Sequence, residues 1–141
     1  MNAAPTLAPP APAAAALTRR GLLDRVLVNA FLAHATDRIY FKDRNSRFIA
    51  VGTTMARHFN GATRAQVIGR TDFDFFAAAH AEPAFEDEQR IMRTGEPILD
   101  KLEKETWPDG RVTWSLTSKL PLRDETGEII GTFGISKDVT K

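Results

Sequence analysis

The alternation of apolar and polar residues predicts one N-terminal helix, followed by a sheet that shorter helices interrupt. Residues 18–35 place apolar side chains three and four positions apart, the spacing of one helix face, after Thr18 as a capping residue. A stripe of this kind must be buried, so we expect it to pack on its own domain or on a second copy of the chain. The stripe consists of Leu22, Leu23, Val26, Leu27, Ala30, Phe31 and His34.

Two short runs with strand character follow this helix. Residues 38–42 and 47–51 flank the polar sequence Asp43-Arg44-Asn45-Ser46, which favours a turn, and together they predict a β-hairpin. Three short helical segments are expected next, each beginning at a threonine that can cap a helix. These threonines are Thr53 or Thr54, Thr63 and Thr71.

A longer helix and two long strands are predicted after the short helices. Pro83 suits the first turn of this helix, and Thr94-Gly95 suits its end. The strands cover residues 98–107 and 112–122, with a tight turn between them. In the second strand apolar residues alternate with polar ones, and we expect the apolar set to face the core. The apolar set includes Val112, Trp114, Leu116 and Leu120.

The last run, residues 129–140, is rich in β-branched residues and contains Gly131 and Gly134. A glycine inside a strand indicates that another backbone or a ligand comes close to it. With the strands above, the pattern predicts an α+β fold with five antiparallel strands, in which helices are inserted between the second strand and the third.

The C-terminal end of the chain, from Pro121 to Thr140, resembles that of PAS sensor domains. The opening Tyr40-Phe41-Lys42-Asp43 and the run Gly69-x-Thr71-Asp72-x-Asp74-x-Phe76 are also similar to this family, so the resemblance extends from about residue 36 to residue 140. One departure is Gly52, where the family usually has an asparagine that ties the strand to the next helix. The C-terminal motif comprises Pro121-Leu122-Arg123-Asp124, Gly127, Gly131, Gly134 and Asp138-Val139-Thr140.

The resemblance implies a PAS-like sheet of order 2-1-5-4-3 with short helices on one face. It implies a PAS domain at residues 36–141, after the amphipathic helix at 18–35. The alanine and proline content of residues 1–17 predicts a disordered tail or linker before that helix. The resemblance also implies a homodimer formed through this helix, in a parallel arrangement. The residues expected in the dimer contact are Leu23, Val26, Leu27, Ala30 and Phe31.

The same resemblance implies a non-catalytic sensory input domain of a bacterial signal-transduction protein, such as a sensor histidine kinase of a two-component system or a diguanylate cyclase. Asp138, Val139 and Thr140 would pass the signal to a C-terminal effector domain. The alternative is a PAS-like module for dimerisation or partner docking, with a filled core and no ligand. A small enzyme is a third alternative.

Composition narrows these possibilities. A formal net charge of +1 gives no electrostatic reason to expect nucleic acid or an anionic membrane as a partner. The absence of cysteine excludes disulfides, thiolate metal sites and the light-sensing subtype that forms a flavin–cysteine adduct. The sequence lacks an apolar run long enough to span a bilayer and the basic start of a secretory signal, so we expect a cytoplasmic location.

The residue pattern predicts neither a catalytic centre nor a metal site. His34, His58 and His80 are more than twenty residues apart and have no partners at ligand spacing. The cofactor is therefore unknown: none, or a small organic ligand, with flavin less favoured. Haem is less favoured because His80 precedes the expected helix start at Pro83.

An internal pocket is the remaining candidate site. Glu103 and Glu105 can pair with Lys119 on the neighbouring strand, either as an exposed ion pair or as a polar anchor for a carboxylate ligand. The residues expected to line the pocket are Phe59, Ile68, Phe76, Phe85, Met92, Trp114, Leu116 and Phe133.

Overall fold

A computed structural model of the protein describes residues 18–141, so the tail or linker predicted at 1–17 lies outside the described residues. The described residues divide into two compact units, 18–30 and Phe31–Lys141. The predicted N-terminal helix is α1 (Arg19–His34), and Thr18 caps it by accepting a hydrogen bond from the Gly21 amide at 3.0 Å. None of the helices in residues 18–141 has the length and apolar character that crossing a bilayer requires.

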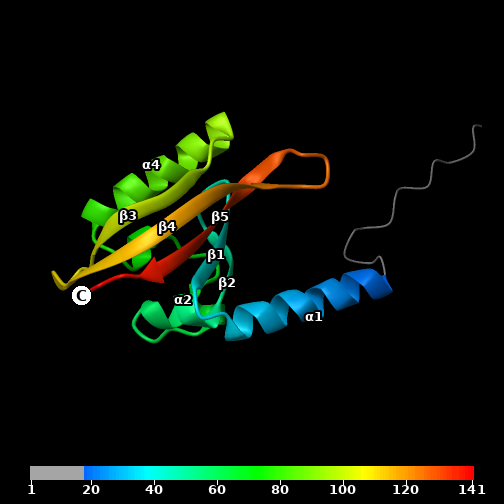
Figure 1. Ribbon diagram of the computed structural model, residues 1–141, viewed down its shortest axis with the longest axis horizontal. Coiled ribbons are helices and arrows are strands. Elements are labelled where there is room, and N and C mark those ends of the chain that lie inside the picture. The colour runs from blue at the N-terminus through cyan, green and yellow to red at the C-terminus, as the bar shows by residue number, and fades with distance from the viewer. Residues whose placement is uncertain (1–17) are drawn as a thin grey trace, which may run out of the picture. The chain divides into compact units, whose positions relative to one another are not determined.

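Five antiparallel strands form one sheet in the order β2-β1-β5-β4-β3 (Figure 1). This order places the last strand of the chain at the centre of the sheet and confirms the predicted α+β fold. The strands are β1 (Arg38–Asp43), β2 (Phe48–Val51), β3 (Ile98–Thr106), β4 (Val112–Arg123) and β5 (Ile129–Asp138).

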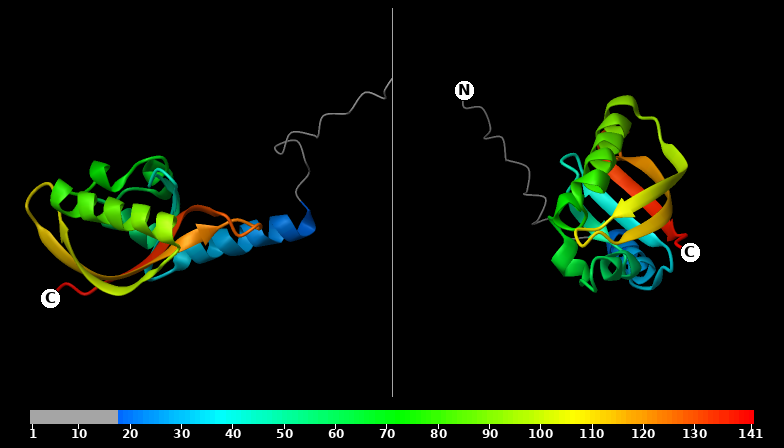
Figure 2. Two further views of the ribbon diagram at one scale, coloured as in Figure 1. Left: turned by 90° about the horizontal axis from the view of Figure 1, so that it is seen from above. Right: turned by 90° about the vertical axis from the view of Figure 1, so that its left-hand side faces the viewer.

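The segment between β2 and β3 forms the helices that cover one face of the sheet (Figure 2). Its turns begin where the sequence predicts caps: Thr63 and Gln66 form a complete capping box, and the Thr71 amide donates to Asp74 Oδ2 at 2.8 Å. The helices are α2 (Thr53–His58), α3 (Arg64–Val67), the 3₁₀ turn η2 (Asp72–Asp74) and α4 (Ala78–Thr94).

The start of α4 corrects one prediction. The helix begins at Ala78 rather than near Pro83, which instead lies inside it. Pro83 lacks an amide proton, yet the preceding turn is held by bonds from the His80 and Ala81 amides to the Ala77 carbonyl, both at 3.0 Å. The end is as predicted, because Gly95 adopts φ 74° and donates to the Ile91 carbonyl at 2.7 Å.

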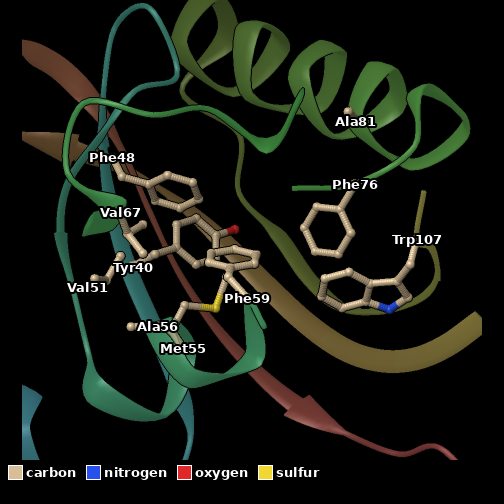
Figure 3. Close-up of a cluster of buried hydrophobic side chains, with 10 residues drawn as sticks. All are labelled: Tyr40, Phe48, Val51, Met55, Ala56, Phe59, Val67, Phe76, Ala81 and Trp107. Carbon is tan, nitrogen blue, oxygen red and sulfur yellow. The ribbon is translucent and has the colours of Figure 1, made fainter. Parts of the chain in front are cut away.

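An aromatic core joins β1 and β2 to the covering helices (Figure 3). The rings of Phe59 and Phe75 stack with their centroids 4.1 Å apart, and Phe76 lies 4.5 Å from Trp107. Such pairs add to the stability that burial of apolar area provides. The buried members are Tyr40, Phe48, Val51, Met55, Ala56, Phe59, Val67, Phe76, Ala81 and Trp107.

The two glycines of β5 have the role that the sequence predicts. A β-carbon at Gly131 would overlap the carbonyl oxygen of Lys42, and one at Gly134 would overlap the ring of Tyr40. Tyr40 is the register partner of Gly134, so the missing side chain leaves room for the tyrosine ring. The close neighbours are therefore a backbone and an aromatic ring of this chain.

The two faces of β4 are reversed relative to the prediction, because its polar side chains point toward the core. Ser115, Thr117 and Lys119 are at most 4% exposed, whereas Trp114, one of the residues expected in the core, is 38% exposed. The expectation that the apolar set faces the core is therefore wrong for this strand. The physical reason is that each inward polar side chain has an internal partner, and a paired polar group can be buried.

Candidate functional site

A buried lysine occupies the middle of the sheet. Lys42 in β1 is 2% exposed, and its Nζ donates to Asp72 Oδ2 of η2 at 2.7 Å and to Glu88 Oε2 of α4 at 2.6 Å. Burial alone would lower the pKa of Lys42, but the charges of Asp72 and Glu88 outweigh burial and hold the pKa well above its ordinary value. Lys42 is therefore charged, and it connects the sheet to two of the covering elements.

A second buried lysine lies on β4. Lys119 Nζ is 2.7 Å from Glu103 Oε1 and 3.3 Å from Asp87 Oδ2, and Lys101 donates to the same Asp87 oxygen at 2.6 Å. The predicted pairing of Glu103 with Lys119 is thus present, but it is buried rather than exposed. Burial would lower the pKa of Lys119, and the charge of Glu103 more than offsets this effect and raises it.

Arg38 connects the interior to the end of the chain. Arg38 is 4% exposed, and its Nη1 lies 3.3 Å from Glu105 Oε1. The same Nη1 is 2.7 Å from His58 Nε2, which in turn lies 3.2 Å from Glu105 Oε1. Its Nη2 lies 3.4 Å from Asp138 Oδ2. One guanidinium is thus shared by three side chains from α2, β3 and the end of β5.

Glu105 is ionised in this setting. Burial raises the pKa of the Glu105 carboxyl, but the hydrogen bond and charge of His58 together with the charge of Arg38 lower it below its ordinary value. Thr113 also donates to Glu105 Oε1 at 2.9 Å and accepts from Trp107 Nε1 at 2.9 Å. The carboxylate is therefore held by three side chains, those of Arg38, His58 and Thr113, and is sensitive to a change in any of them.

The last residues of the chain are tied to β4. The Val139 amide donates to the Trp114 carbonyl at 2.9 Å, and Thr140 Oγ1 accepts from the Trp114 amide at 2.8 Å. Asp138 Oδ1 accepts from the Thr140 amide at 2.8 Å. These bonds from Thr140, aided by the charge of Arg38, lower the pKa of Asp138. Asp138 is thus an anion that contacts both the chain end and the interior network.

The charged groups enclose a small cavity of about 30 Å³. A volume of this size holds about two water molecules. Its lining is mostly polar, and it includes both buried lysines and the carboxylates that pair with them. The lining residues are Tyr40, Lys42, Met55, Asp72, Phe76, His80, Ala84, Glu88, Glu103, Glu105, Thr117, Lys119 and Ser136.

Most of the predicted pocket residues lie elsewhere, and Phe76 is the one that lines this cavity. Phe59 belongs to the aromatic core, and Met92 is buried on α4. Ile68 and Phe85 are exposed. Trp114, Leu116 and Phe133 lie on the sheet face opposite the helices, where Phe133 stacks on Phe41 at 5.6 Å. Their assignment to the pocket is therefore wrong, because it assumed that the apolar face of β4 points inward.

His80 also differs from its expected position. It lies in the first turn of α4 rather than before the helix, is 8% exposed, and places Nδ1 3.2 Å from the Lys104 carbonyl oxygen. His80 lines the cavity and also a neighbouring cleft of about 170 Å³ between α4 and β3. The position of His80 before Pro83 therefore no longer stands as an argument against haem.

The sequence analysis missed the residues that carry most of the charge at this site. Arg38, Tyr40 and Lys42 alternate in β1 and so share one face, and this spacing was a signal that two cations point inward together. The spacing of α4 places Glu88 on the same helix face as the buried Ala84 and Ile91, so this periodicity was a signal that its carboxylate points inward. The structure then shows its partner, Lys42.

Comparison with known proteins agrees with the fold. A family model described as the PAS fold matches residues 32–141. The methanogenesis regulatory histidine kinase FilI of Methanothrix harundinacea is 32% identical over 106 residues, which are 75% of this chain and 12% of the kinase.

Two solved structures of VqmA are also similar. VqmA bound to DPO superposes with a TM-score of 0.70 at 25% identity, over 83% of this chain and 57% of that one. The Vibrio cholerae VqmA dimer gives a TM-score of 0.70 at 26% identity, over 84% of this chain and 51% of that one. The chain thus spans about half the length of the VqmA chains and a small part of the kinase. By the family model and the shared sheet order, the chain belongs to the PAS family.

Proposed function

We propose that this chain is a non-catalytic sensory input domain of a signal-transduction protein. It binds a small ligand in the cavity beside Lys42 and Lys119 and passes the signal through Asp138-Val139-Thr140 to an effector domain. The observation that carries this proposal is the shared guanidinium of Arg38, which pairs with the cavity-lining Glu105 and with Asp138. The names of two relatives support it, because FilI is a regulatory histidine kinase and VqmA was solved bound to DPO.

The cavity has the composition of a binding site. Buried ion pairs seldom stabilise a fold more than apolar residues of the same volume would, so a cluster of them calls for another role. Polar groups from β1, β3, β4, β5 and α4 converge on the cavity. Several of them have displaced pKa values, which is typical of functional sites.

The Arg38 network provides a route for the signal. A ligand that changes the hydrogen bonds of Glu105 also changes the strength of its pairing with Arg38. The pairing of Arg38 with Asp138 changes in turn, because both carboxylates contact the same guanidinium. Asp138 in turn binds the Thr140 amide. A small change at the cavity can therefore bias the conformation of the chain end, as in other switches built on ion pairs.

Asp138→Ala in the full-length protein tests this route. We expect the ligand-dependent change in effector output to fall by about tenfold or more, a usual size for coupling between sites. Ligand affinity and the unfolding midpoint should stay unchanged, because Asp138 is half exposed. Glu125→Ala, at an exposed position in the β4–β5 turn, is the control. Normal output from the Asp138 variant would refute a role in transmission.

A dimerisation module with a filled core is the second candidate, and the small cavity volume favours it. Native mass spectrometry of the purified protein separates the two. A discrete additional mass on the protein supports the sensory function. A bare dimer whose mass and unfolding midpoint are unchanged by candidate ligands supports the dimerisation module.

The proposed partner is a second copy of the chain, bound through α1. A single helix cannot bury its own apolar stripe, and Val26, Leu27 and Phe31 are each more than half exposed. The Vibrio cholerae relative was solved as a dimer. That structure is described in relation to target DNA, so the expected lack of nucleic-acid contact is proposed for this segment alone.

Leu27→Glu tests the dimer. A carboxylate in the stripe has to be desolvated on association, so we expect a dissociation constant at least tenfold higher, which analytical ultracentrifugation can measure. Asn29→Glu introduces the same charge about half a turn away around the helix and should leave association unchanged. An unaltered mass for the Leu27 variant would remove α1 from the interface.

A further inference from the structure

The cavity contains more acid than base. Its lining includes four carboxylates, on Asp72, Glu88, Glu103 and Glu105. Three buried cations face them: Lys42 and Lys119 in the lining, and Arg38 on Glu105. Lys119 is also shared with Asp87 outside the cavity. The interior therefore holds one negative charge without a cation of its own.

Glu88 is the carboxylate whose hydrogen bonds are incomplete. It is 1% exposed, and its Oε2 accepts from Lys42. Its Oε1 has no hydrogen-bond partner among residues 18–141, and neither does the nearby buried Ser46 Oγ. Leaving a buried acceptor unpaired costs about 1–3 kcal/mol, and more when it is charged. A hydrogen-bond donor would remove this cost, and a positively charged donor would also balance the excess negative charge of the lining.

The charges of the cavity disfavour an anionic ligand. Both lysine ammonium groups already have carboxylate partners within 2.7 Å, so a second anion would have to displace an acidic side chain. It would also be repelled by the four carboxylates of the lining. The charges therefore disfavour the carboxylate ligand that the pairing of Glu103 with Lys119 had suggested.

From this balance we infer that the cavity binds a small organic cation, with a primary ammonium group beside Glu88. The inference rests on the ligand-binding function proposed above and names the class of its ligand. Tyr40, Thr117 and Ser136 line the same cavity and offer hydroxyl groups to the ligand.

A cleft between α4 and β3 adjoins the cavity. The cleft of about 170 Å³ shares three lining residues with the cavity, namely His80, Ala84 and Glu103. Asp87 also lines this cleft, where it pairs with Lys101, and Lys104 lines it as well. An amine of two to four carbons can therefore place its ammonium group in the cavity and its carbon chain in the cleft.

A proton competes with the ammonium ligand for the Glu88 carboxylate. Burial raises the pKa of Glu88, and the charge of Asp72 adds to this effect, while Lys42 opposes it. The other charged or titratable groups of the lining are Tyr40 on β1, His80 on α4, Glu103 and Glu105 on β3, and Lys119 on β4. Because the folded pKa is raised, Glu88 binds its proton more tightly than a free glutamate. The affinity for an ammonium ligand should therefore fall as the pH falls through this raised pKa.

Three probes of similar size and different charge test the inference on the chain Met1–Lys141: ethylammonium chloride, ethanol and sodium acetate. Amide NMR at pH 7.5 follows the residues of the cavity, and thermal unfolding gives an independent measure. We expect ethylammonium to shift the Lys42 and Glu88 resonances and to raise the unfolding midpoint. Ethanol and acetate should do neither, and ethylammonium should bind more weakly as the pH is lowered.

Glu88→Gln keeps an acceptor for Lys42 but removes the charge, so we expect ethylammonium to bind at least tenfold more weakly. Glu86→Gln, on an exposed position of α4, should bind as the parent does. If Glu88→Gln does not fold, the pH dependence of ethylammonium binding to the parent protein still tests the role of Glu88. Acetate or ethanol binding as tightly as ethylammonium would overturn the cation class and leave ligand binding intact. Absence of binding by all three would overturn the inference and would also count against ligand binding in this cavity.

Discussion

Replacing Lys42 with methionine is expected to lower the free energy of unfolding by about 3–5 kcal/mol, the usual cost of removing one partner from a buried ion pair. Methionine fills a similar volume, so the loss comes from charge rather than from a void. Asp72 and Glu88 would remain inside the fold without the ammonium group that holds both of them. Chemical denaturation at pH 7 measures the change.

The pH dependence of this loss identifies its cause. Without Lys42 the folded pKa of Glu88, already raised by burial, rises further. A carboxyl whose folded pKa is raised destabilises the fold above that pKa, and the penalty is relieved as the pH falls through it. The deficit of the variant should therefore shrink in acid. Combining Lys42→Met with Glu88→Gln should recover part of the loss at pH 7 for the same reason.

Lys104→Met provides the control, because Lys104 is on the same sheet but exposed. Its effect should stay within about 0.5 kcal/mol. A deficit for Lys42→Met that is below about 1 kcal/mol, or that is the same at every pH, would contradict the role assigned to the lysine.

The sequence predicts the fold well because local signals set its elements. Threonine caps, the glycine after α4 and the turn before β5 act over a few residues, and a single strand register follows from them. The start of α4 was misplaced because Pro83 tolerates a position inside the helix as well as in its first turn. Boundaries of this kind depend on tertiary contacts that a local pattern does not contain.

The site was harder to predict, because the rule that apolar residues face inward fails in this domain. On β4 the polar set of Ser115, Thr117 and Lys119 is buried, and the apolar set with Trp114 lies on the other face. Burial of a lysine depends on whether a carboxylate from a distant element reaches it. Glu88 reaches Lys42 across 46 positions of the sequence, a distance at which alternation carries no information.

Replacing Arg38 with glutamine is expected to have the next largest effect, a loss of about 3 kcal/mol in the free energy of unfolding at pH 7. Glu105 is 4% exposed and would keep His58 and Thr113 but lose its permanent cation. Glutamine retains hydrogen-bonding capacity, so the change isolates the charge. Urea denaturation between pH 3 and pH 8 measures it.

The sign of the pH effect follows from Glu105. Its folded pKa lies below the ordinary value of 4.5, so its contribution to stability is present above about that pH and is lost as the pH falls further. Arg38→Gln removes part of this contribution, and the gap between variant and parent should close in acid. A gap that is equally large at pH 3 would mean that the loss comes from packing.

Comparison with Asp138→Ala then separates stability from signalling. Both changes break the contact between Arg38 and Asp138, but Asp138 is half exposed, and exposed ion pairs contribute little to stability. If the contact carries the signal, both variants lose ligand-dependent output, while only Arg38→Gln loses stability. If only the Arg38 variant loses output, the signal depends on the pairing of Arg38 with Glu105 and not on the contact with Asp138. The chain end would then respond through its hydrogen bonds to the Trp114 backbone.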